Sequence, residues 1–333
     1  MQRPRSVAVI GAGIAGLAAA GRLQKAGCQV VVLEKSRGVG GRMATRRDES
    51  LAFDHGAQYF TAHGPVFAAQ AEAWEGAGLV AHWPPQGLSG RAEGCWVGVP
   101  GMTAPCRSLA EGLLIVTGCT VRDLSRDDDR WRLASDDGAV VAAGLDRFDA
   151  VVLAIPAPQA VPLIAASGAA LPGPERASYA PCWALMLAGE KDFADLPAAF
   201  SPEDGAIAWV ARNGTKPGRP QGVETVVVHA TPDWSRAHLE MAPETVASQL
   251  TQRLGACTRR SLEPTYARAH RWRYALVEQA VGQPCLWNAE AGLGACGDWC
   301  IGARVEAAFD SGVALAAAIL GEQAPPMGHE ARR

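Results

Sequence analysis

The chain has 333 residues, of which 48% are hydrophobic and 20% are charged, and its formal net charge at pH 7 is −3. This composition is typical of a globular protein long enough for two domains, and it excludes the basic surface that nucleic-acid binding requires. No stretch reaches the roughly 18 consecutive apolar residues of a membrane span. The nine cysteines include no C-x-x-C pair, so we expect free thiols, a reducing compartment and a cytoplasmic location.

The first forty residues have a strand–turn–helix–strand pattern. Residues 6–10, SVAVI, form a β-branched run typical of a buried parallel strand, and residues 29–33 form a second one. Between them, an alanine-rich helix follows a G-x-G-x-x-G fingerprint at Gly11, Gly13 and Gly16. The arginines before the first apolar run resemble the start of a signal peptide, but glycines at this spacing argue against secretion.

Each residue of the fingerprint has a physical task. Gly11 permits the tight turn, Gly13 lets the backbone approach a pyrophosphate, and Gly16 lets the helix pack closely on the strand. The N-terminus of the helix offers free N–H groups and a positive dipole end to the phosphates. Glu34, at the end of the second strand, is placed to accept hydrogen bonds from ribose hydroxyls. The pattern predicts dinucleotide binding, and by itself it does not separate NAD from FAD.

A loop rich in glycine and arginine, KSRGVGGRMATRR, occupies residues 35–47 directly after Glu34. Its glycines allow a close approach to a long, extended ligand, and Arg42 can pair with a phosphate. A solvated surface loop is the alternative interpretation. The segment FDHGAQYFTA follows at residues 53–62.

These residues carry a resemblance to a known family. In the FAD-dependent amine oxidase superfamily the motif E-x(5–6)-G-G-R follows the fingerprint, and here Glu34 is followed by Gly40, Gly41 and Arg42. The combination GGRMATRR…FDHGAQYFTA is similar to the renalase branch, especially to the bacterial renalase-like proteins. The resemblance covers essentially the whole chain. It implies that the loop wraps the FAD pyrophosphate, with Arg42 at the phosphates or the flavin edge.

The far end of the chain fits the same resemblance. Residues 293–296 form a short apolar run, Gly297 and Asp298 end it, and residues 304–320 read as an alanine-rich helix. In the superfamily a G-D segment contacts the ribityl and phosphate groups, and the next helix N-terminus points at the flavin ring, where its dipole stabilises the anionic reduced form. Asp298 is therefore expected on the ribityl side and residues 302–305 near the ring. A helix that only packs on the sheet is the alternative.

Two central segments complete the expected cofactor-binding unit. Residues 119–142 read as a β-meander whose first strand, through Val121, would contact adenine, and residues 148–160 read as a buried strand with a proline turn. The expected fold class is α/β, with a Rossmann-type FAD-binding domain (amine oxidase/p-hydroxybenzoate hydroxylase-like) and an inserted α+β substrate domain with an antiparallel sheet. The expected divisions are an FAD-binding domain (1–61, 98–157 and 289–322), a substrate domain (62–97 and 158–288) and a tail (323–333).

Noncovalently bound FAD is the cofactor that the resemblance implies. Cys300 does not match the covalent cysteine pattern of the superfamily, so no covalent bond is expected. The residues that we expect to bind FAD come from the fingerprint, the following acid, the loop, the FDHGAQYFTA segment, the meander and the C-terminal motif. They are Gly11, Gly13, Ala15, Gly16, Glu34, Lys35, Gly41, Arg42, Met43, Gly56, Ala57, Gln58, Tyr59, Val121, Asp298, Arg304 and Val305.

The remaining segments are expected to form a substrate-binding sheet that roofs the flavin. Within WVARNGTKPGR, residues 209–219, the part NGTKPGR reads as a hairpin loop, and the segment recurs in the bacterial renalase branch. The predicted strands are 184–190, 206–212, 224–231 and 267–276, and the predicted helices are 65–77 and 243–254.

A flavin site needs a flat, mostly apolar slot that stacks the substrate on the ring. Renalases line this slot with aromatic residues and a histidine, and the resemblance carries those roles to particular positions here. Taken singly, each of these side chains is more typical of core packing. The residues expected in the catalytic slot are Trp272, His229, Tyr274 and Phe200, with Trp209 and His270 as further candidates.

The resemblance implies an FAD-dependent oxidase that converts the 2- and 6-dihydro isomers of NAD(P)H to NAD(P)⁺ by hydride transfer to flavin N5, with O₂ reduced to H₂O₂. Such substrates are strong hydride donors, so stacking and orientation supply most of the catalysis and no general base is required. The expected partners are a small-molecule substrate and O₂. No nucleic acid, membrane or metal is expected, and the chain is expected to be a monomer or a homodimer.

Two alternatives stay open. The first is another oxidoreductase of the superfamily. An amine oxidase would call for an aromatic pair beside the flavin and a lysine near N5, and a carotenoid-type desaturase would call for a longer chain with an apolar membrane-binding patch. Only Lys191 and Lys216 occur in the substrate segments, and neither lies on an obvious buried strand. The second is a flavin-binding redox sensor without turnover. A dehydrogenase that uses NAD alone would leave the C-terminal motif unexplained.

Overall fold

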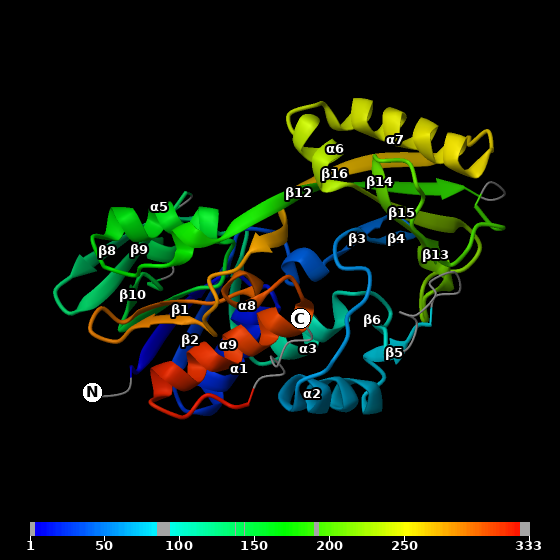
Figure 1. The fold of residues 1–333 in the computed structure, drawn as a ribbon. Helices are drawn as coiled ribbons and strands as arrows, with labels where there is room; N and C mark the ends of the chain where they lie inside the picture. Colours follow the sequence, from blue (N-terminus) through cyan, green and yellow to red (C-terminus); the bar gives the residue numbers. More distant parts are fainter. Residues whose placement is uncertain (1–3, 85–93, 137, 143, 190–192, 327–333) are drawn as a thin grey trace.

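The computed structural model describes residues 4–84, 94–136, 138–142, 144–189 and 193–326. Two sheets lie at opposite ends of an elongated molecule, and two long strands of the second sheet reach toward the first (Figure 1). Among the residues so described, no helix combines the length and the apolarity needed to cross a membrane.

A six-stranded sheet forms the first unit. Neighbouring strands are parallel from β18 to β7, and within this sheet β17 alone runs antiparallel to its neighbour. The central strands are buried on both faces, which explains why their sequences are uninterrupted apolar runs. In spatial order the strands are β17 (Leu286–Asn288), β18 (Leu293–Ala295), β11 (Ala150–Leu153), β1 (Ser6–Ile10), β2 (Gln29–Glu34) and β7 (Leu114–Thr117).

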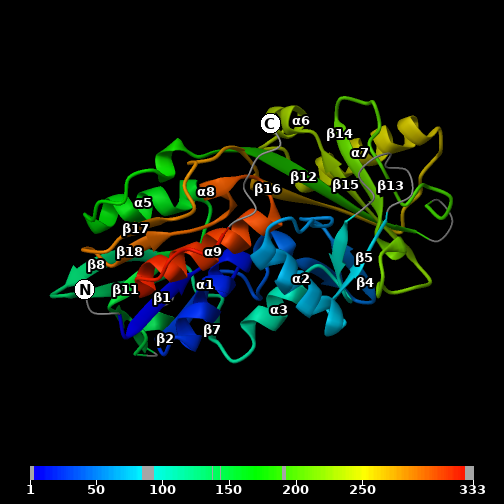
Figure 2. The ribbon, with the colours of Figure 1, turned by 60° about the horizontal axis from the view of Figure 1, so that its bottom comes forward.

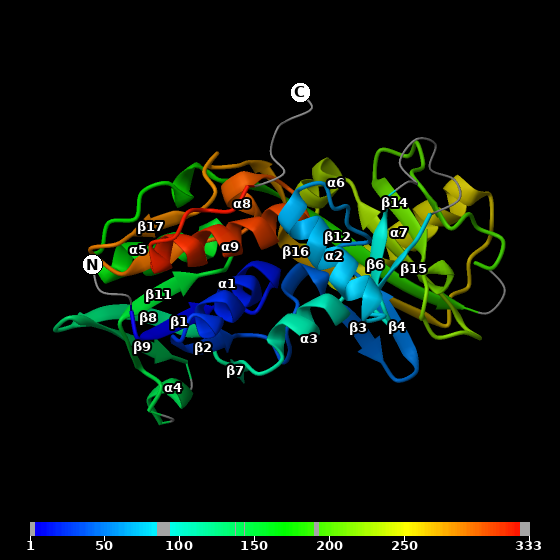
Figure 3. The same cartoon turned by 90° about the horizontal axis from the view of Figure 1, so that it is seen from below.

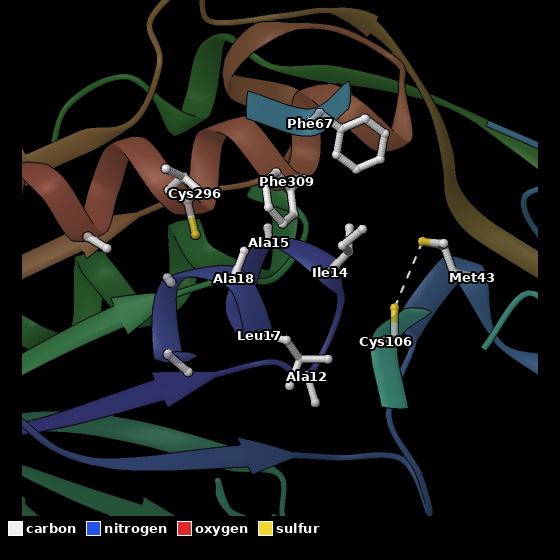
Figure 4. Packing of buried hydrophobic residues seen from close by; sticks show 14 of the residues in the cluster. Ala12, Ile14, Ala15, Leu17, Ala18, Met43, Phe67, Cys106, Cys296 and Phe309 are labelled. Atoms are coloured by element: carbon white, nitrogen blue, oxygen red, sulfur yellow. Dashed lines mark hydrogen bonds between the residues drawn. The ribbon is translucent and has the colours of Figure 1, made fainter. Parts of the chain in front are cut away.

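Two helices, α1 (Ile14–Lys25) and α9 (Val305–Leu320), pack against each other on one face of this sheet (Figures 2 and 3). Their backbones approach closely because small residues face the contact: a Cβ added to Gly312 would lie 2.1 Å from the carbonyl oxygen of Ala15. Figure 4 shows Phe309 of α9 between α1 and the aromatic side chain of Phe67. This packing fixes the N-termini of both helices beside the ends of the parallel strands.

The opposite face of the six-stranded sheet packs against α5 (Ala157–Ser167) and a small antiparallel sheet. Trp131 and Leu133 of the small sheet are fully buried in this contact. The small sheet is formed by β8 (Val121–Asp127), β9 (Arg130–Ser135) and β10 (Arg147–Phe148).

The second unit is an antiparallel sheet of five strands. One face packs on α7 (Pro243–Thr258) and α6 (Pro232–Ala237), and the other faces the hairpin of β3 (Thr45–Asp48) and β4 (Leu51–Asp54) (Figure 1). Side chains therefore alternate between the two faces along every strand. In spatial order the strands are β13 (Ala199–Phe200), β14 (Ile207–Arg212), β15 (Glu224–Ala230), β12 (Ser178–Gly189) and β16 (Tyr266–Gln279).

Shorter elements connect the two units. The helix α2 packs in the same core cluster as α1 and α9, and β5 pairs with β6. The remaining elements are α2 (Pro65–Gly76), α3 (Ala104–Ala110), α4 (Ala139–Ala142), α8 (Asp298–Ile301), β5 (Val80–His82), β6 (Trp96–Gly98) and the 3₁₀ turns η1 (Gly41–Met43), η2 (Pro174–Arg176) and η3 (Asn213–Thr215).

The architecture agrees with the expected fold class, but two segments lie elsewhere than predicted. The stretch 62–97 was assigned to the substrate unit, yet Phe67 and Trp74 of α2 face Phe309 and bury their apolar stripe against the first unit. Likewise α5, from the stretch after residue 157, covers the six-stranded sheet. The third strand of the expected meander comes from β10, because part of residues 119–142 forms α4.

Candidate functional site

A cavity of about 1960 Å³ runs between the two units. It extends from the ends of β1 and β2 to the five-stranded sheet, and it is lined by segments from the beginning, middle and end of the chain. Sites for drug-sized ligands usually measure roughly 300–1,000 Å³. The cavity is therefore large enough for a dinucleotide and a second molecule.

The fingerprint forms one end of the cavity. Gly11 has a φ of +107°, and a Cβ there would lie 2.5 Å from the carbonyl oxygen of Ala154. A Cβ on Gly16 would lie 2.1 Å from the carbonyl oxygen of Gly11, so both positions need glycine for the turn and the close packing. The N-cap residue Gly13 makes no side-chain cap, which leaves the N-terminus of α1 open toward an anion.

Glu34 stabilises the turn from the end of β2. Its carboxylate accepts hydrogen bonds from the backbone N–H of Ala12, at 2.8 Å, and from that of Ser36, at 2.7 Å. The side chain is 7% exposed and lines the cavity. It is thus fixed at the edge of the cleft, in the position that the ribose of a dinucleotide would occupy.

Of the residues expected to bind FAD, all except Gly16 line this one cavity. Gly16 lies within α1, where its missing Cβ lets the helix pack closely on the turn at Gly11. The residues come from four regions that are up to about three hundred positions apart in the sequence, so their convergence depends on the fold. Their individual roles toward FAD stay predictions.

Arg42 and Asp298 form a bidentate ion pair, with both N–H···O distances at 2.7 Å. The guanidinium also donates to the carbonyl oxygen of Ala275, at 3.0 Å, and lies 6.0 Å from the ring centre of Tyr179. The negative charge of Asp298 raises the pKa of Arg42 against the opposing effect of burial, which is the largest single influence. Arg42 thus joins the glycine-rich loop to the C-terminal motif and to β16.

The residues at this end of the cavity fit FAD. The N-terminus of α9 is a second helix start without a side-chain cap, and Arg304 and Val305 line the cavity there. Two helix N-termini and the open backbone at Gly13 suit a ligand with a pyrophosphate and a ring that becomes anionic on reduction. Around Gly13 a Cβ would meet no atom within 4 Å, so a ligand can approach the backbone.

The other end of the cavity is a row of side chains across the five-stranded sheet. The register pairs Trp209 with His229, His229 with Ala184, and Ala184 with His270. Directly opposed residues in antiparallel strands point to the same face, so this row faces away from α7. Trp272 lies two positions from His270 and shares that face. We call these five residues the sheet row.

His55, which follows β4, packs against the sheet row. Its ring centre lies 4.9 Å from that of His270 and 5.0 Å from that of Trp272. Its carbonyl oxygen accepts hydrogen bonds from Nε1 of Trp272, at 2.9 Å, and from Nε2 of His229, at 3.2 Å. The segment from Gly56 to Tyr59, which lines the cavity, is thereby tied to the five-stranded sheet.

The three histidines in this wall are neutral at physiological pH. Burial is the main cause: it lowers the pKa of His55 to about 3 and that of His229 to about 4. Burial also lowers the pKa of His270, and the positive charge of Arg46 acts in the same direction on His55 and His270. The slot is therefore lined by aromatic rings without positive charge of their own.

Of the residues expected in the catalytic slot, the structure brings Trp272, His229 and Tyr274 together in the cavity wall. Phe200, which was also expected in the slot, does not line the cavity. It pairs with Val210, whose side chain faces α7, and it packs in that cluster rather than in the wall of the cavity. Since side chains alternate along β14, Trp209 takes the position facing the cavity instead. Lys191 and Glu190 lie outside the described residues.

A buried charge cluster lies behind the slot. Asp54 accepts hydrogen bonds from Nη2 of Arg219, at 2.6 Å, and from Nζ of Lys216, at 3.3 Å, and all three side chains are fully buried. Lys216 also donates to Gln58, which lines the cavity. Sequence reasoning placed Lys216 in a hairpin loop off any buried strand. The hairpin is present, but its loop folds inward and buries Lys216. In the sequence, the only feature that could have indicated a buried carboxylate is the pair of cations in KPGR.

Basic side chains dominate the cavity wall. Among the described residues that line it, the carboxylates are Glu34 and Asp298, and both are already hydrogen-bonded to backbone N–H groups or to Arg42. Arg122 pairs with Asp136, and Arg271 and Arg273 pair with Glu240, and both of these acids lie outside the wall. The basic side chains still outnumber these acids, and such an excess favours anionic ligands. The basic residues in the wall are Lys35, Arg37, Arg42, Arg46, Arg47, Arg107, Arg122, Arg271, Arg273 and Arg304.

Two family models match the chain. A model described as an NAD(P)-binding Rossmann-like domain matches residues 9–72, and one described as flavin containing amine oxidoreductase matches residues 75–320. A similar curated protein is a 4,4'-diapophytoene desaturase (4,4'-diaponeurosporene-forming) of Staphylococcus haemolyticus, 50% identical over 50 residues. Those residues are 15% of this chain, and the chain spans only about 10% of the length of that relative.

Solved structures with low sequence identity share the whole fold. A putative protoporphyrinogen oxidase from Exiguobacterium sp. 255-15 has a TM-score of 0.75 at 16% identity, covering 96% of this chain and 99% of the other. Putrescine oxidase bound to putrescine has a TM-score of 0.70 at 15% identity, with the same coverage. Cyclohexylamine oxidase from Brevibacterium oxydans IH-35A has a TM-score of 0.70 at 14% identity, again covering 96% and 99%.

Proposed function

This chain belongs to the flavin-containing amine oxidoreductases, and we propose that it oxidises the 2- and 6-dihydro isomers of NAD(P)H to NAD(P)⁺ while O₂ is reduced to H₂O₂. The chain is an FAD-dependent oxidoreductase with FAD as its cofactor. When bound, FAD supplies the hydride acceptor. We propose that it is held noncovalently, because Cys300 is buried outside the cavity wall and burial raises its thiol pKa to about 12.

The charge of the cavity is the observation that carries this proposal. The wall contains more basic side chains than the carboxylates that pair with them, which are Glu34 and Asp298 in the wall and Asp136 and Glu240 outside it. The pyrophosphate of one FAD neutralises only part of that positive charge. A dinucleotide substrate brings a second pyrophosphate, whereas a protonated amine would meet positive potential without a free carboxylate to pair with it.

The sheet row supports the same substrate class. Trp272 and His270 offer flat ring surfaces, and the neutral histidines add no charge that would oppose a cationic nicotinamide product. The residues of this wall stack and orient the ring and exclude water. Because a dihydronicotinamide is already a hydride donor, orientation is the main contribution required of the protein. No carboxylate base lines this part of the described cavity, which agrees with that requirement.

The test is anaerobic mixing of the purified yellow protein with the 2- and 6-dihydro isomers of NAD and NADP, and separately with putrescine and cyclohexylamine. We expect rapid bleaching of the flavin absorbance by at least one isomer and none by the amines. Bleaching at low substrate concentration should slow as salt is added, because the attraction between an anionic substrate and the arginines is screened.

Two results would contradict the proposed reaction. Bleaching by amines alone would assign it to amine oxidation within the same family. If no donor bleaches the flavin, the FAD assignment stands and the proposed substrate is lost. Regular NADPH serves as the matched control, since it has the same charge and carboxamide but carries its hydride at a different ring position.

A further inference from the structure

Arg46 differs from the other basic side chains of the cavity wall. It is half-buried, and its guanidinium makes no hydrogen bond or ion pair with any residue that the structure describes. Charged groups are rarely removed from water without a partner, so such a guanidinium in a cavity wall indicates an anion that arrives with a ligand. The other arginines of the described wall that lack a partner are exposed to solvent, which screens their charge; they are Arg37, Arg47 and Arg107.

The register of the β3–β4 hairpin directs Arg46 toward the five-stranded sheet. Arg46 pairs with Phe53, and directly opposed residues of antiparallel strands project from the same face. Phe53 is fully buried against the sheet, where its ring stacks on that of Tyr266 with the centres 5.1 Å apart. Arg46 therefore faces β16. Its neighbour Arg47 projects from the opposite face of the hairpin, because side chains alternate along a strand.

The guanidinium lies beside two imidazoles of the slot. The rings of His55 and His270 are in contact, with centres 4.9 Å apart. Burial is the main cause of their lowered pKa values, and the positive charge of Arg46 adds to it in both, which places the guanidinium near the two rings. Asp48, the carboxylate on the same strand, pairs with Arg268 at 3.6 Å. Arg46 is thus a positive charge among neutral rings.

This position is separate from the expected phosphate site of FAD. The FAD pyrophosphate is expected at the open N-terminus of α1, and Arg42 is tied to the carbonyl oxygen of Ala275, near the cofactor end of β16. His270 lies five residues farther from that end and beyond Trp272, which we propose to stack the substrate ring. An anion at Arg46 therefore belongs to the second ligand of the cavity.

We infer that Arg46 binds the substrate phosphate nearest to the nicotinamide ring. Its planar guanidinium can donate two parallel N–H groups to phosphate oxygens. Trp272 and His270 are about 7 Å apart along the strand, which is comparable with the ribose that separates the ring from this phosphate. Holding the ring at one point and the phosphate at another orients the substrate, so Arg46 determines specificity for nucleotides. This inference rests on the proposed function, because it takes nicotinamide nucleotides as the ligands of the slot.

The test compares two ligands that differ by one phosphate. The FAD-loaded protein is titrated with nicotinamide mononucleotide and with nicotinamide riboside, and binding is followed by the change in flavin absorbance. We expect the wild-type protein to bind the mononucleotide about tenfold to hundredfold more tightly, as for a hydrogen bond to a charged group. The same ratio is expected for kcat/KM with the dihydro isomers of the two ligands.

Three variants of Arg46 and one control isolate the contact. Arg46→Ala should weaken the mononucleotide to the level of the riboside and leave the riboside unchanged. Arg46→Gln, which keeps much of the length without the charge, should do the same, and it decides the test if the alanine variant is unstable. Arg46→Lys keeps the charge without the fork of donors and should restore part of the preference. Arg253→Ala is the matched control: it removes an arginine of α7, on the other face of the same sheet, where it pairs with Asp204.

The outcomes distinguish this inference from the proposed function. Equal binding of the two ligands by the wild type, or a ratio in the uncharged Arg46 variants that stays as in the wild type, would overturn the inference even if the dihydro isomers are oxidised. An equal fall of the ratio in Arg253→Ala would overturn it too, since net charge alone would then explain the preference. A preference for the mononucleotide that depends on Arg46, in a protein that oxidises none of the isomers, would support the phosphate site and remove the proposed reaction.

Discussion

Asp54 holds together the buried charges of this protein. It is fully buried between Lys216 and Arg219, and it also accepts hydrogen bonds from Thr45 and from the backbone of Met102. Although burial alone would raise the pKa of Asp54, the two cations lower it to about 2. Its contribution to stability is therefore complete above the ordinary pKa of 3.8 and is lost as the pH falls toward about 2.

Removing this carboxylate should destabilise the protein strongly. In Asp54→Asn two buried cations lose their partner, and such a loss typically costs about 3–5 kcal/mol. We expect the free energy of unfolding at pH 7, measured with urea, to fall by that amount. The difference from the wild type should shrink as the pH is lowered from 4 to 2, because the wild-type carboxylate is then protonated too.

Asp233→Asn is the control, since Asp233 forms an exposed ion pair with Arg236 and should change stability by less than about 1 kcal/mol. Similar losses in both variants would contradict the argument.

The sequence predicts residues whose task is local and misses those whose task depends on a distant partner. Gly11 and Glu34 are predictable because a turn and a strand end require those residue types within a short segment. Lys216 and His55 are not, because nothing near them in sequence shows that they are buried. His55 meets the sheet row only after strands more than a hundred residues away have paired. Phe200 was misplaced for another reason: it pairs with Val210, and this register puts its side chain on the opposite face of the sheet.

At the scale of elements, the helix α2 depends on a residue of α9. Its N-cap, Gly64, has no side chain to satisfy the first N–H groups of the helix. The carboxylate of Glu306 instead holds the chain where it enters the helix, accepting from the backbone N–H of His63 at 2.8 Å and from that of the N-cap Gly64 at 2.6 Å. Because Glu306 is 1% exposed, the helix start and α9 are held together in a dry contact. This explains why α2 belongs with the first unit.

Glu306→Ala should loosen the start of α2. Losing a cap of this kind costs about 1–2 kcal/mol, and we expect a lower melting temperature together with faster hydrogen exchange at the amides of residues 63–68. Glu306→Gln keeps an oxygen acceptor and should lose less. Exchange that speeds up equally in α7, which makes no contact with Glu306, would indicate a global effect instead of a lost cap.

At the scale of the whole molecule, two long strands and one ion pair connect the units. β12 and β16 run from the cofactor end to the substrate sheet (Figure 1), and Arg42 binds both Asp298 and the backbone of β16. Residues from the beginning and the end of the chain thus meet beside the cavity. The presence of two units was predictable from the motifs. The boundary between the units was not, because α2 and α5 pack where their apolar faces fit and not where their place in the chain suggests.

Arg42→Ala should separate these segments and weaken FAD binding. The cavity then loses the positive charge of Arg42, and losing a hydrogen bond to a charged phosphate, worth about 1.5–3 kcal/mol, corresponds to roughly a tenfold to hundredfold loss of affinity. We expect the purified variant to be largely colourless, as measured by the ratio of flavin to protein absorbance. Arg236→Ala, which removes an exposed arginine away from the cavity, should stay yellow. Full FAD occupancy in Arg42→Ala would count against the role given to this pair.

The sheet row has a consequence for how such a protein diversifies. Its side chains stand on strands whose pairing is made by backbone atoms, so exchanging Trp209 need not disturb the skeleton. His229 and His270 also contact His55, so exchanging them alters the contact with the segment after β4. The glycine turn and the Arg42–Asp298 pair lie on other segments. We therefore expect exchanges in the sheet row to change substrate choice more than FAD binding. Natural or designed variants that differ only at these few positions can therefore be tested for new substrates while FAD stays bound.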